Sequence, residues 1–310
     1  MKLLEDNTIF NELVIKVAKW KNLTNESIIR DFYIVELLEN LSNSEYVEQC
    51  VFKGGTSLSK CYPNSIERFS EDIDLTFLGM DLNDNKCDKI LKRIEQTIIG
   101  QFNFEKIVNE RNQRNKSSYI WHDNYSNGIK LEIGSQIRPD PYSKKEIKSY
   151  IYEYLEINAL FDLIKKYELK KIQINALNIE RTFIDKVMAI KRHAICGTLK
   201  KKVRHLYDIY RLLLMKDIQE FLQNKDELKR LLQLTKKTDS FYLNKRNLDV
   251  EYNSMGPYDF DSWKDKLNDE IKSIYENLHL SLLYNREKLK FSDVLNSLEY
   301  INSVFIEIGE

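Results

Sequence analysis

Apolar side chains recur every three or four positions in two segments near the N-terminus and in several later ones. Residues 8–21 and Ser27–Leu41 predict two amphipathic helices, the second capped by Asn25. The same periodicity predicts later helices at Thr56–Cys61, Cys87–Ile99, Ile157–Leu163, Ile179–Ala194, Val203–Met215 and 217–235. Short apolar or alternating runs beside turn residues predict strands at Glu48–Phe52, Ile73–Leu78, Phe104–Asn109, Ser117–Trp121 and Ile129–Gly134.

The predicted strands all lie in the first half of the chain, so the two halves differ in class. Arg138–Tyr142 (RPDPY) contains two prolines, which disfavour helix and central strand. We therefore expect an α+β domain with a small mixed sheet at 1–140 and a mainly helical domain at 141–310. Turn residues at Asp123–Gly128 and at Asn253–Tyr258 predict loops within these domains.

Composition narrows the class of protein. The 310 residues include 48 Lys+Arg and 48 Asp+Glu, so the chain is not a uniformly basic protein that coats nucleic acid. No apolar run approaches the ~20 residues that span a bilayer, and we expect no membrane partner. The four cysteines and four histidines show no zinc spacing. The first residues lack a secretory signal pattern, so we expect a cytoplasmic location.

A glycine pair, Gly54-Gly55, precedes Thr56 and Ser57 between a predicted strand and a predicted helix. Glycine lets the backbone approach a ligand closely, and the N–H groups that open a helix attract anions. A plain structural turn has the same composition. Lys60, just beyond, would add charge for an anion or would simply be a solvated lysine. This segment alone leaves a phosphate site and a turn as alternatives.

Asp72 and Asp74 flank Ile73 at the start of a predicted strand. Because alternate side chains of a strand share a face, the two carboxylates would project together while Ile73 enters the core. Paired carboxylates suit a hard divalent cation, Mg²⁺ or Mn²⁺, which nucleotide phosphates help to bind. A solvated strand edge is the alternative.

The two motifs occur together in Phe52–Leu78, FKGGTSLSKCYPNSIERFSEDIDLTFL. A strand, a Gly-Gly turn, a helix and a strand with Asp-x-Asp is the layout of the polymerase-β-like nucleotidyltransferases, although 16 residues between Gly55 and Asp72 make a long connection. The segments FKGGTSLSK and RFSEDIDL resemble the AbiEii/AbiGii-type toxins, minimal nucleotidyltransferases of bacterial toxin–antitoxin and phage-abortive systems. The resemblance extends over about residues 27–215. It implies a polymerase-β-like nucleotidyltransferase core followed by a helical C-terminal domain.

The resemblance also assigns roles to residues of this chain. The nucleotide-binding set that it implies is Gly54, Gly55, Thr56, Ser57, Arg68 and Ser70. Asp72 and Asp74 would be catalytic and would hold the metal ion. A third carboxylate ligand is usual in the superfamily. Glu132, which lies opposite the apolar positions of its strand, is the candidate, with an exposed edge glutamate as the alternative.

Two later helices carry the remaining family positions. Glu180–Lys186 (ERTFIDK) matches the family's glutamate and lysine, and Arg204–Asp208 (RHLYD) matches its arginine and aspartate. The resemblance implies that Lys186 and Asp208 are catalytic and belong to the cleft. Lys186 would meet the nucleotide phosphates as a compact charge. Asp208 would either reach the cleft or brace Lys186 or Arg204.

The stretch 186–205 contains seven Lys or Arg and no Asp or Glu, which suits an RNA backbone; a solvated helix end is the alternative. Together, the motifs and the resemblance predict a Mg²⁺-dependent nucleotidyltransferase toxin that uses an NTP. Family analogy makes RNA, at the tRNA 3′ end, the expected acceptor and a cognate antitoxin the expected protein partner. Transfer to a protein hydroxyl, and a nucleotide-binding module without catalysis, remain alternatives.

Overall fold

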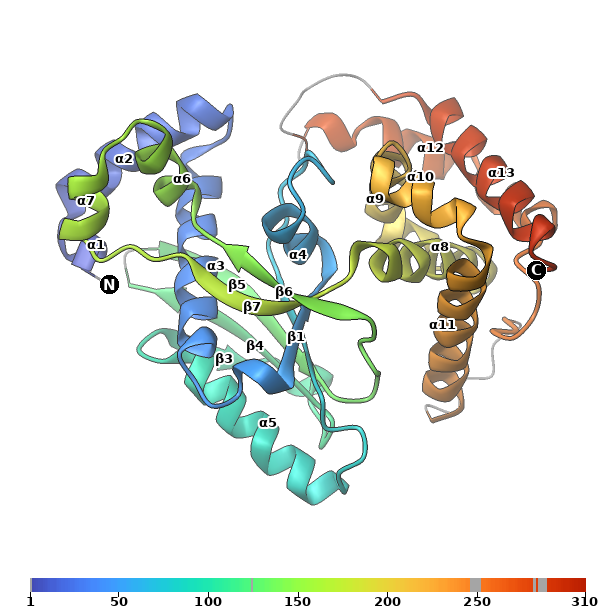
Figure 1. The fold of residues 1–310 in the computed structure, drawn as a ribbon, viewed down its shortest axis with the longest axis horizontal. Coiled ribbons are helices and arrows are strands. Elements are labelled where there is room, and N and C mark those ends of the chain that lie inside the picture. The colour runs from blue at the N-terminus through green and yellow to red at the C-terminus, as the bar shows by residue number, and fades with distance from the viewer. Residues whose placement is uncertain (1, 124, 246–251, 281–282, 284–288) are drawn as a thin grey trace. The chain divides into compact units, whose positions relative to one another are not determined.

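The computed structural model describes residues 2–123, 125–245, 252–280, 283 and 289–310 (Figure 1). The chain forms two compact units. Unit 1 holds Met1–Pro63 and Phe69–Leu177, and unit 2 holds Asn64–Arg68 and Asn178–Glu310. The division therefore falls after Leu177, whereas the sequence predicts it at 140. The cause of the difference is that residues 141–177 contribute two further strands to the sheet of unit 1.

Unit 1 is built on a seven-stranded mixed sheet in the order β3-β4-β5-β2-β1-β7-β6. Its strands are β1 Cys50–Lys53, β2 Ile73–Phe77, β3 Asn103–Lys106, β4 Asn115–His122, β5 Tyr125–Gly134, β6 Tyr142–Ile147 and β7 Ile172–Leu177. β2 runs antiparallel to β1 and parallel to β5, and β1 runs parallel to β7. The predicted mixed sheet is confirmed. The loop prediction at 123–128 is wrong in part, because β5 already begins at Tyr125; Asn124 lies outside the described residues.

The helices of unit 1 are α1 Lys2–Glu5, α2 Asn7–Lys21, α3 Asn25–Ser42, α4 Gly54–Cys61, α5 Asp84–Ile99, α6 Tyr150–Ile157 and α7 Phe161–Lys166, with short 3-10 turns η1 Val47–Gln49 and η2 Val108–Glu110. α3 packs against α5, β5 and β7, and α4 packs against β1 and β2. The cap of α3 is Thr24, whose side chain accepts the N–H of Ser27, rather than Asn25. The helix predicted at Ile157–Leu163 is wrong in part, because α6 ends at Ile157 and α7 begins only at Phe161.

Alternation along β2 and β5 decides which way the acidic residues face. Ile73 and Leu75 of β2 and Leu131 and Ile133 of β5 are almost fully buried. The intervening positions 74 and 132 are partly exposed. Because successive strand side chains point to opposite faces, the apolar positions hold the sheet on the core and turn the carboxylates to the other side.

Unit 2 is helical, as predicted. Its elements are α8 Ile179–Ile195, η3 Leu199–Lys202, α9 Val203–Leu213, α10 Lys216–Gln223, α11 Lys225–Lys245, η4 Phe260–Ser262, η5 Lys264–Lys266, α12 Asp269–Glu276, η6 Leu278–Leu280 and α13 Phe291–Glu307. α9 packs against α8, α10, α12 and α13. Leu206, Ile209 and Leu212 of α9 are fully buried, so one apolar stripe of this helix joins the core of the unit.

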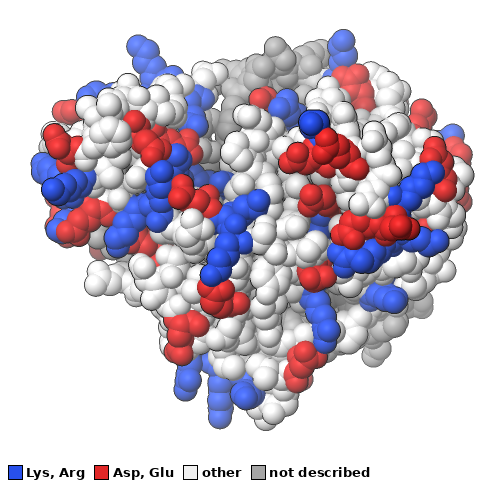
Figure 2. Space-filling view, in the orientation of Figure 1, with Lys and Arg blue, Asp and Glu red and all other residues white. Residues whose placement is uncertain are grey.

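Acidic and basic side chains are interspersed on the face shown in Figure 2. On this face, positive and negative charges are therefore intermixed rather than separated into patches of one sign. Among the described residues, none of the helices combines the length and the apolar character needed to cross a lipid bilayer.

Candidate active site

The first residue of α4 lies against a carboxylate of the neighbouring strand. α4 begins at Gly54, directly after β1 and two residues earlier than predicted. Gly54 has a φ of +83°, a conformation that favours glycine. A Cβ atom built there would lie 2.2 Å from Oδ2 of Asp74, far inside van der Waals contact. Glycine at this position therefore allows the start of α4 to touch an acid of β2.

The start of α4 has the chemistry of an anion site. Lys53, at the N-cap, makes no side-chain capping hydrogen bond, and the first turn has no acidic residue. The leading N–H groups of a helix have no partner inside the helix, and the helix dipole favours negative charge there. Gly54 and Gly55 are only half-buried. These N–H groups are therefore suited to a phosphate.

The two hydroxyls that follow the glycines bind protein atoms. Thr56 and Ser57 are each 2 % exposed. Thr56 Oγ1 donates to the carbonyl oxygen of Asp72 over 2.5 Å and lies 3.0 Å from Oγ of Ser70. Ser57 Oγ donates to the carbonyl oxygen of Phe52 over 3.3 Å. Ser70 itself is half-buried.

Three carboxylates come from β2 and its neighbour β5. Asp72 immediately precedes β2, Asp74 lies in it, and Glu132 of β5 is the register partner of Asp74. Glu132 forms an ion pair with Lys130, which also binds Glu110 over 2.8 Å. Burial acts to lower the pKa of Lys130, but hydrogen bonds to Glu110 and Glu132 raise it above its usual value. Lys130 therefore stays charged beside Glu132.

The donor chemistry of two of these carboxylates fits a divalent cation. The part of the chain that the structure describes contains no group of three or more Asp, Glu, His or Cys side chains placed to hold a metal ion. Mg²⁺ needs no such group, because one or two carboxylates together with substrate phosphates and water suffice. Asp72 and Asp74 supply hard oxygen donors, and Asp74 lies beside the start of α4. Glu132 stays a predicted third ligand.

Two ion pairs that sequence reasoning missed, one of them buried, hold this part of unit 1. Lys60 Nζ lies 2.6 Å from Oδ1 of Asp31, and Oδ2 of Asp31 accepts the N–H of Tyr150 over 2.7 Å. The Lys60 side chain is 3 % exposed, so its reading as a solvated lysine is wrong. Burial raises the pKa of Asp31 above its usual value, although the charge of Lys60 acts to lower it. Arg30 pairs with Glu71 in the loop before β2.

Unit 2 contains a buried cluster of two cations and one carboxylate. Arg68 donates through Nε and Nη2 to the two oxygens of Asp208 over 2.6 and 2.7 Å, and Lys186 Nζ donates to Oδ2 over 2.8 Å. Asp208 is 0 % exposed. Burial acts to raise the pKa of Asp208, but the charges of Arg68 and Lys186 hold it well below its usual value. The structure thus joins three residues that the motifs assigned separately.

Two histidines of unit 2, one of them beside this cluster, have lowered pKa values. His205 Nδ1 is buried and has no hydrogen-bond partner among the described residues. Burial, helped by the charge of Lys186, lowers the pKa of His205 well below its usual value. Burial, with Arg192 next in effect, lowers the pKa of His193 to about 4. His193 Nδ1 lies 2.7 Å from the hydroxyl of Thr198.

The basic stretch 186–205 divides by burial into two parts. Lys186 is in the cluster just described, Lys191 donates to the carbonyl oxygen of Pro257, and Arg192 pairs with Asp239. These cations serve the interior of unit 2. Residues 200, 201 and 204, in η3 and at the start of α9, are exposed. The surface available to a polyanion is therefore shorter than the sequence suggests.

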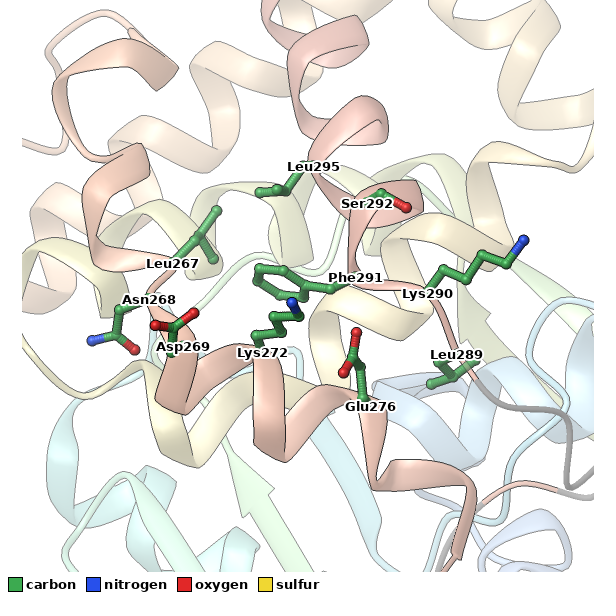
Figure 3. Close-up of a pocket in the computed structure, with 10 residues that line it drawn as sticks. All are labelled: Leu267, Asn268, Asp269, Lys272, Glu276, Leu289, Lys290, Phe291, Ser292 and Leu295. Atoms are coloured by element: carbon green, nitrogen blue, oxygen red, sulfur yellow. The ribbon is translucent and has the colours of Figure 1, made fainter.

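A cavity of about 640 Å³ lies between α12 and α13 of unit 2 (Figure 3). Leu267, Phe291 and Leu295 supply apolar surface, while Lys272 and Glu276 bring opposite charges. None of the predicted site residues lines this cavity. The site predicted from sequence and this cavity are therefore separate features.

A mixed sheet in which a glycine-opened helix start meets a strand with one aspartate in it and another just before it is the arrangement expected of a nucleotidyltransferase core. The sequence matches the family described as "Nucleotidyl transferase AbiEii toxin, Type IV TA system" over residues 36–293. The chain therefore belongs to the AbiEii family, and it is a nucleotidyltransferase toxin of a type IV toxin–antitoxin system. This family implies an NTP substrate, a divalent metal ion and an antitoxin partner.

The structure of the chain matches several solved structures, one of them with a TM-score above 0.5. MenT4, a nucleotidyltransferase toxin from Mycobacterium tuberculosis, is 16% identical with a TM-score of 0.51, over 93% of this chain and 98% of MenT4. A putative nucleotidyltransferase from H. pylori is 18% identical (TM-score 0.40, 83% of this chain and 98% of that one). JHP933 from Helicobacter pylori is 19% identical (TM-score 0.40, 89% and 99%). No curated protein matches the sequence.

Proposed function

We propose that the chain transfers a nucleotide from an NTP to RNA, at the tRNA 3′ end, in a reaction that depends on Mg²⁺. The observation that carries this proposal is the pair Asp72 and Asp74 beside the glycine-opened start of α4. Nucleotidyl transfer requires positioned reactants and neutralised phosphate charge more than covalent catalysis. A helix start suited to phosphate, next to two carboxylates suited to a cation, supplies both.

Unit 1 supplies the metal and phosphate contacts in this proposal. Asp72 and Asp74 hold the cation, and the N–H groups at Gly54 and Gly55 receive nucleotide phosphates. When bound, Mg²⁺ neutralises phosphate charge and lowers the pKa of the acceptor hydroxyl. Glu132 is the proposed third ligand.

On the family resemblance we also assign roles in the reaction to Lys186 and Asp208, which belong to unit 2. Lys186 acts toward the nucleotide phosphates as a point charge. Asp208 positions both Lys186 and Arg68, because all its hydrogen-bond partners in the cluster are cations. In this assignment Asp208 orients charged side chains and does not itself touch the substrate.

An RNA acceptor is supported by the charges in η3 and at the start of α9. Lys201 and Arg204 are exposed, and the first turn of α9 has neither an acidic residue nor a side-chain cap. Cations at a helix N-terminus lie at the positive end of its dipole, an unfavourable placement that a nearby polyanion relieves. Phosphates of the RNA backbone supply such a polyanion. We place the toxin and its cognate antitoxin in the cytoplasm, in defence against phage.

The transfer is tested by incubating the protein with Mg²⁺, total RNA and each labelled NTP in turn. We expect a labelled band of tRNA size, and Asp72→Asn should remove it without unfolding the protein. Asp162→Asn changes an exposed aspartate of α7 in the same unit and should keep full incorporation. Label on protein alone would favour transfer to a protein hydroxyl. NTP binding without incorporation would favour a non-catalytic module, and either result overturns the proposal.

The RNA surface is tested by charge reversal. Lys201→Glu with Arg204→Glu should raise the KM for RNA and flatten its salt dependence, while the KM for NTP stays unchanged. Each lost contact to single-stranded RNA should reduce the slope of log K against log salt by about 0.7. Lys229→Glu with Lys237→Glu makes the same change in net charge at exposed positions of α11. Equal effects of the two pairs would show that net charge alone matters and would remove the surface from the proposal.

A further inference from the structure

The first turn of α4 contacts both acids of the metal-binding pair. Gly54 lies against the carboxylate of Asp74, where a Cβ would come within 2.2 Å of Oδ2. One residue beyond the glycine pair, Thr56 reaches the backbone of Asp72 through its hydroxyl, over 2.5 Å. The first turn of α4 therefore contacts the side chain of Asp74 and the main chain of Asp72.

The Asp72 carbonyl lies just outside the regular pairing of the sheet. β2 begins at Ile73, and its pairing with β5 begins with Ile73 opposite Leu131. The bond from Thr56 thus ties the chain at the point where the long connection from α4 enters β2. Since Asp72 and Asp74 are two positions apart, fixing the backbone at this entry point orients the first carboxylate relative to the second.

The hydroxyl of Thr56 is already committed to protein atoms. A carbonyl oxygen can only accept a hydrogen bond, so the single hydroxyl proton of Thr56 goes to Asp72. Ser70 Oγ lies 3.0 Å from the same oxygen, and Thr56 is 2 % exposed. A phosphate would have to break the bond to Asp72 before it met this hydroxyl.

We propose that Thr56 is a positioning residue, whose hydroxyl holds the backbone of Asp72 so that the two aspartates bind the divalent cation. This inference rests on the proposed function of that pair. It differs from the role implied by the family resemblance, in which the hydroxyl after the glycines binds phosphate. The two roles predict different kinetic effects when the hydroxyl is removed.

The test uses the full chain with Thr56→Val, which keeps the shape of the side chain, and Thr56→Ser, which keeps the hydroxyl. We expect Thr56→Val to lower kcat at least tenfold and to raise the half-saturating Mg²⁺ concentration at least fivefold. The KM for NTP at saturating Mg²⁺ should change less than twofold. Thr56→Ser should recover most of kcat. Thr238→Val removes a threonine bond to a backbone carbonyl in α11, over 2.8 Å, and should leave all three constants unchanged.

A second readout needs no turnover. The rise in Tm that Mn²⁺ causes without nucleotide should be at least halved in Thr56→Val and preserved in Thr56→Ser. If Thr56→Val does not fold, Thr56→Ala removes the same hydroxyl and should show the same loss. An unchanged metal response in the valine or alanine variant overturns the proposal, as does a raised KM for NTP with unchanged kcat. Absence of nucleotide incorporation in the wild type would refute the proposed function, while the Mn²⁺ response would still test Thr56.

Discussion

Removing the charge of Asp208 should destabilise unit 2 by several kcal/mol. Asp208→Asn keeps the size of the side chain but leaves Arg68 and Lys186 buried without a compensating anion. Their side chains are 4% and 7% exposed, so water reaches them little. Breaking a buried ion pair by removing one partner costs about 3–5 kcal/mol, because the remaining charge stays in a medium of low polarity.

The hydrogen bonds of the cluster give a similar magnitude. Asp208 accepts three charge-assisted bonds of 2.6, 2.7 and 2.8 Å. Each contributes roughly 1.5–3 kcal/mol, so their sum sets an upper bound of about 5–9 kcal/mol. An asparagine oxygen still accepts part of this bonding. We therefore expect the free energy of unfolding to fall by about 3–5 kcal/mol.

Urea unfolding followed by far-UV circular dichroism measures this loss. Asp217→Asn changes an exposed aspartate of α10 in the same unit and should alter stability by less than about 0.5 kcal/mol. Adding Lys186→Met to Asp208→Asn removes one uncompensated cation. The second substitution should therefore cost at least about 1 kcal/mol less in that background than in the wild type.

The pH dependence follows from the direction of the shift. The pKa of Asp208 lies below its usual value, so its contribution is present above about pH 4 and is lost as the pH falls below the usual value of an aspartate. The difference between the wild type and Asp208→Asn should thus be the same at pH 7 and pH 5. A loss below 1 kcal/mol, or strict additivity with Lys186→Met, would refute this account of the cluster.

Three further predictions concern both units. Gly54→Ala should lower incorporation at least tenfold and raise the half-saturating Mg²⁺ concentration, because its Cβ would enter the space of the Asp74 carboxylate; kinetics equal to the wild type would contradict this. Glu132→Gln should lower kcat if the carboxylate is a metal ligand, and full activity would leave it as the partner of Lys130. As the pH falls below 6.5, the free energy of unfolding of His193→Gln should rise relative to that of the wild type by about 1.4 kcal/mol per pH unit. The reason is that the folded pKa of His193 is about 4. A pH-independent difference in urea unfolding would contradict that reading.

Strong local periodicity made most helices predictable. α2 and α9 bury one face each, and their apolar spacing is visible in the sequence. β6 was missed because its side chains are mostly exposed and follow no apolar alternation. It belongs to the sheet through backbone pairing with β7. β7 was missed as well, although its apolar residues Ile172, Ile174 and Ala176 alternate with polar ones. Without these two strands, the domain boundary drawn from the prolines fell too early.

The candidate site was predictable as a set of residues but not as a set of contacts. Gly54, Asp72 and Asp74 follow from two short motifs and their order. The bond from Thr56 to Asp72 does not follow from them. The sequence is the same whether this threonine binds the backbone of the protein or a phosphate. Similarly, the sequence predicts a surface position for Lys60, because its partner Asp31 lies 29 positions away.

The sequence by itself determined the class of protein. The motifs, their order and the residues within them identify an AbiEii-type nucleotidyltransferase. This is possible because helix starts, glycine turns and paired acids are local features of a sequence. Only the tertiary structure decided which charged and hydroxyl groups bind one another. Arg68 and Asp208 are 140 positions apart, yet they form the buried pair that also holds Lys186. Hydrogen bonds and ion pairs depend on distance in space. Spacing along the chain predicts that distance only within a single helix or strand.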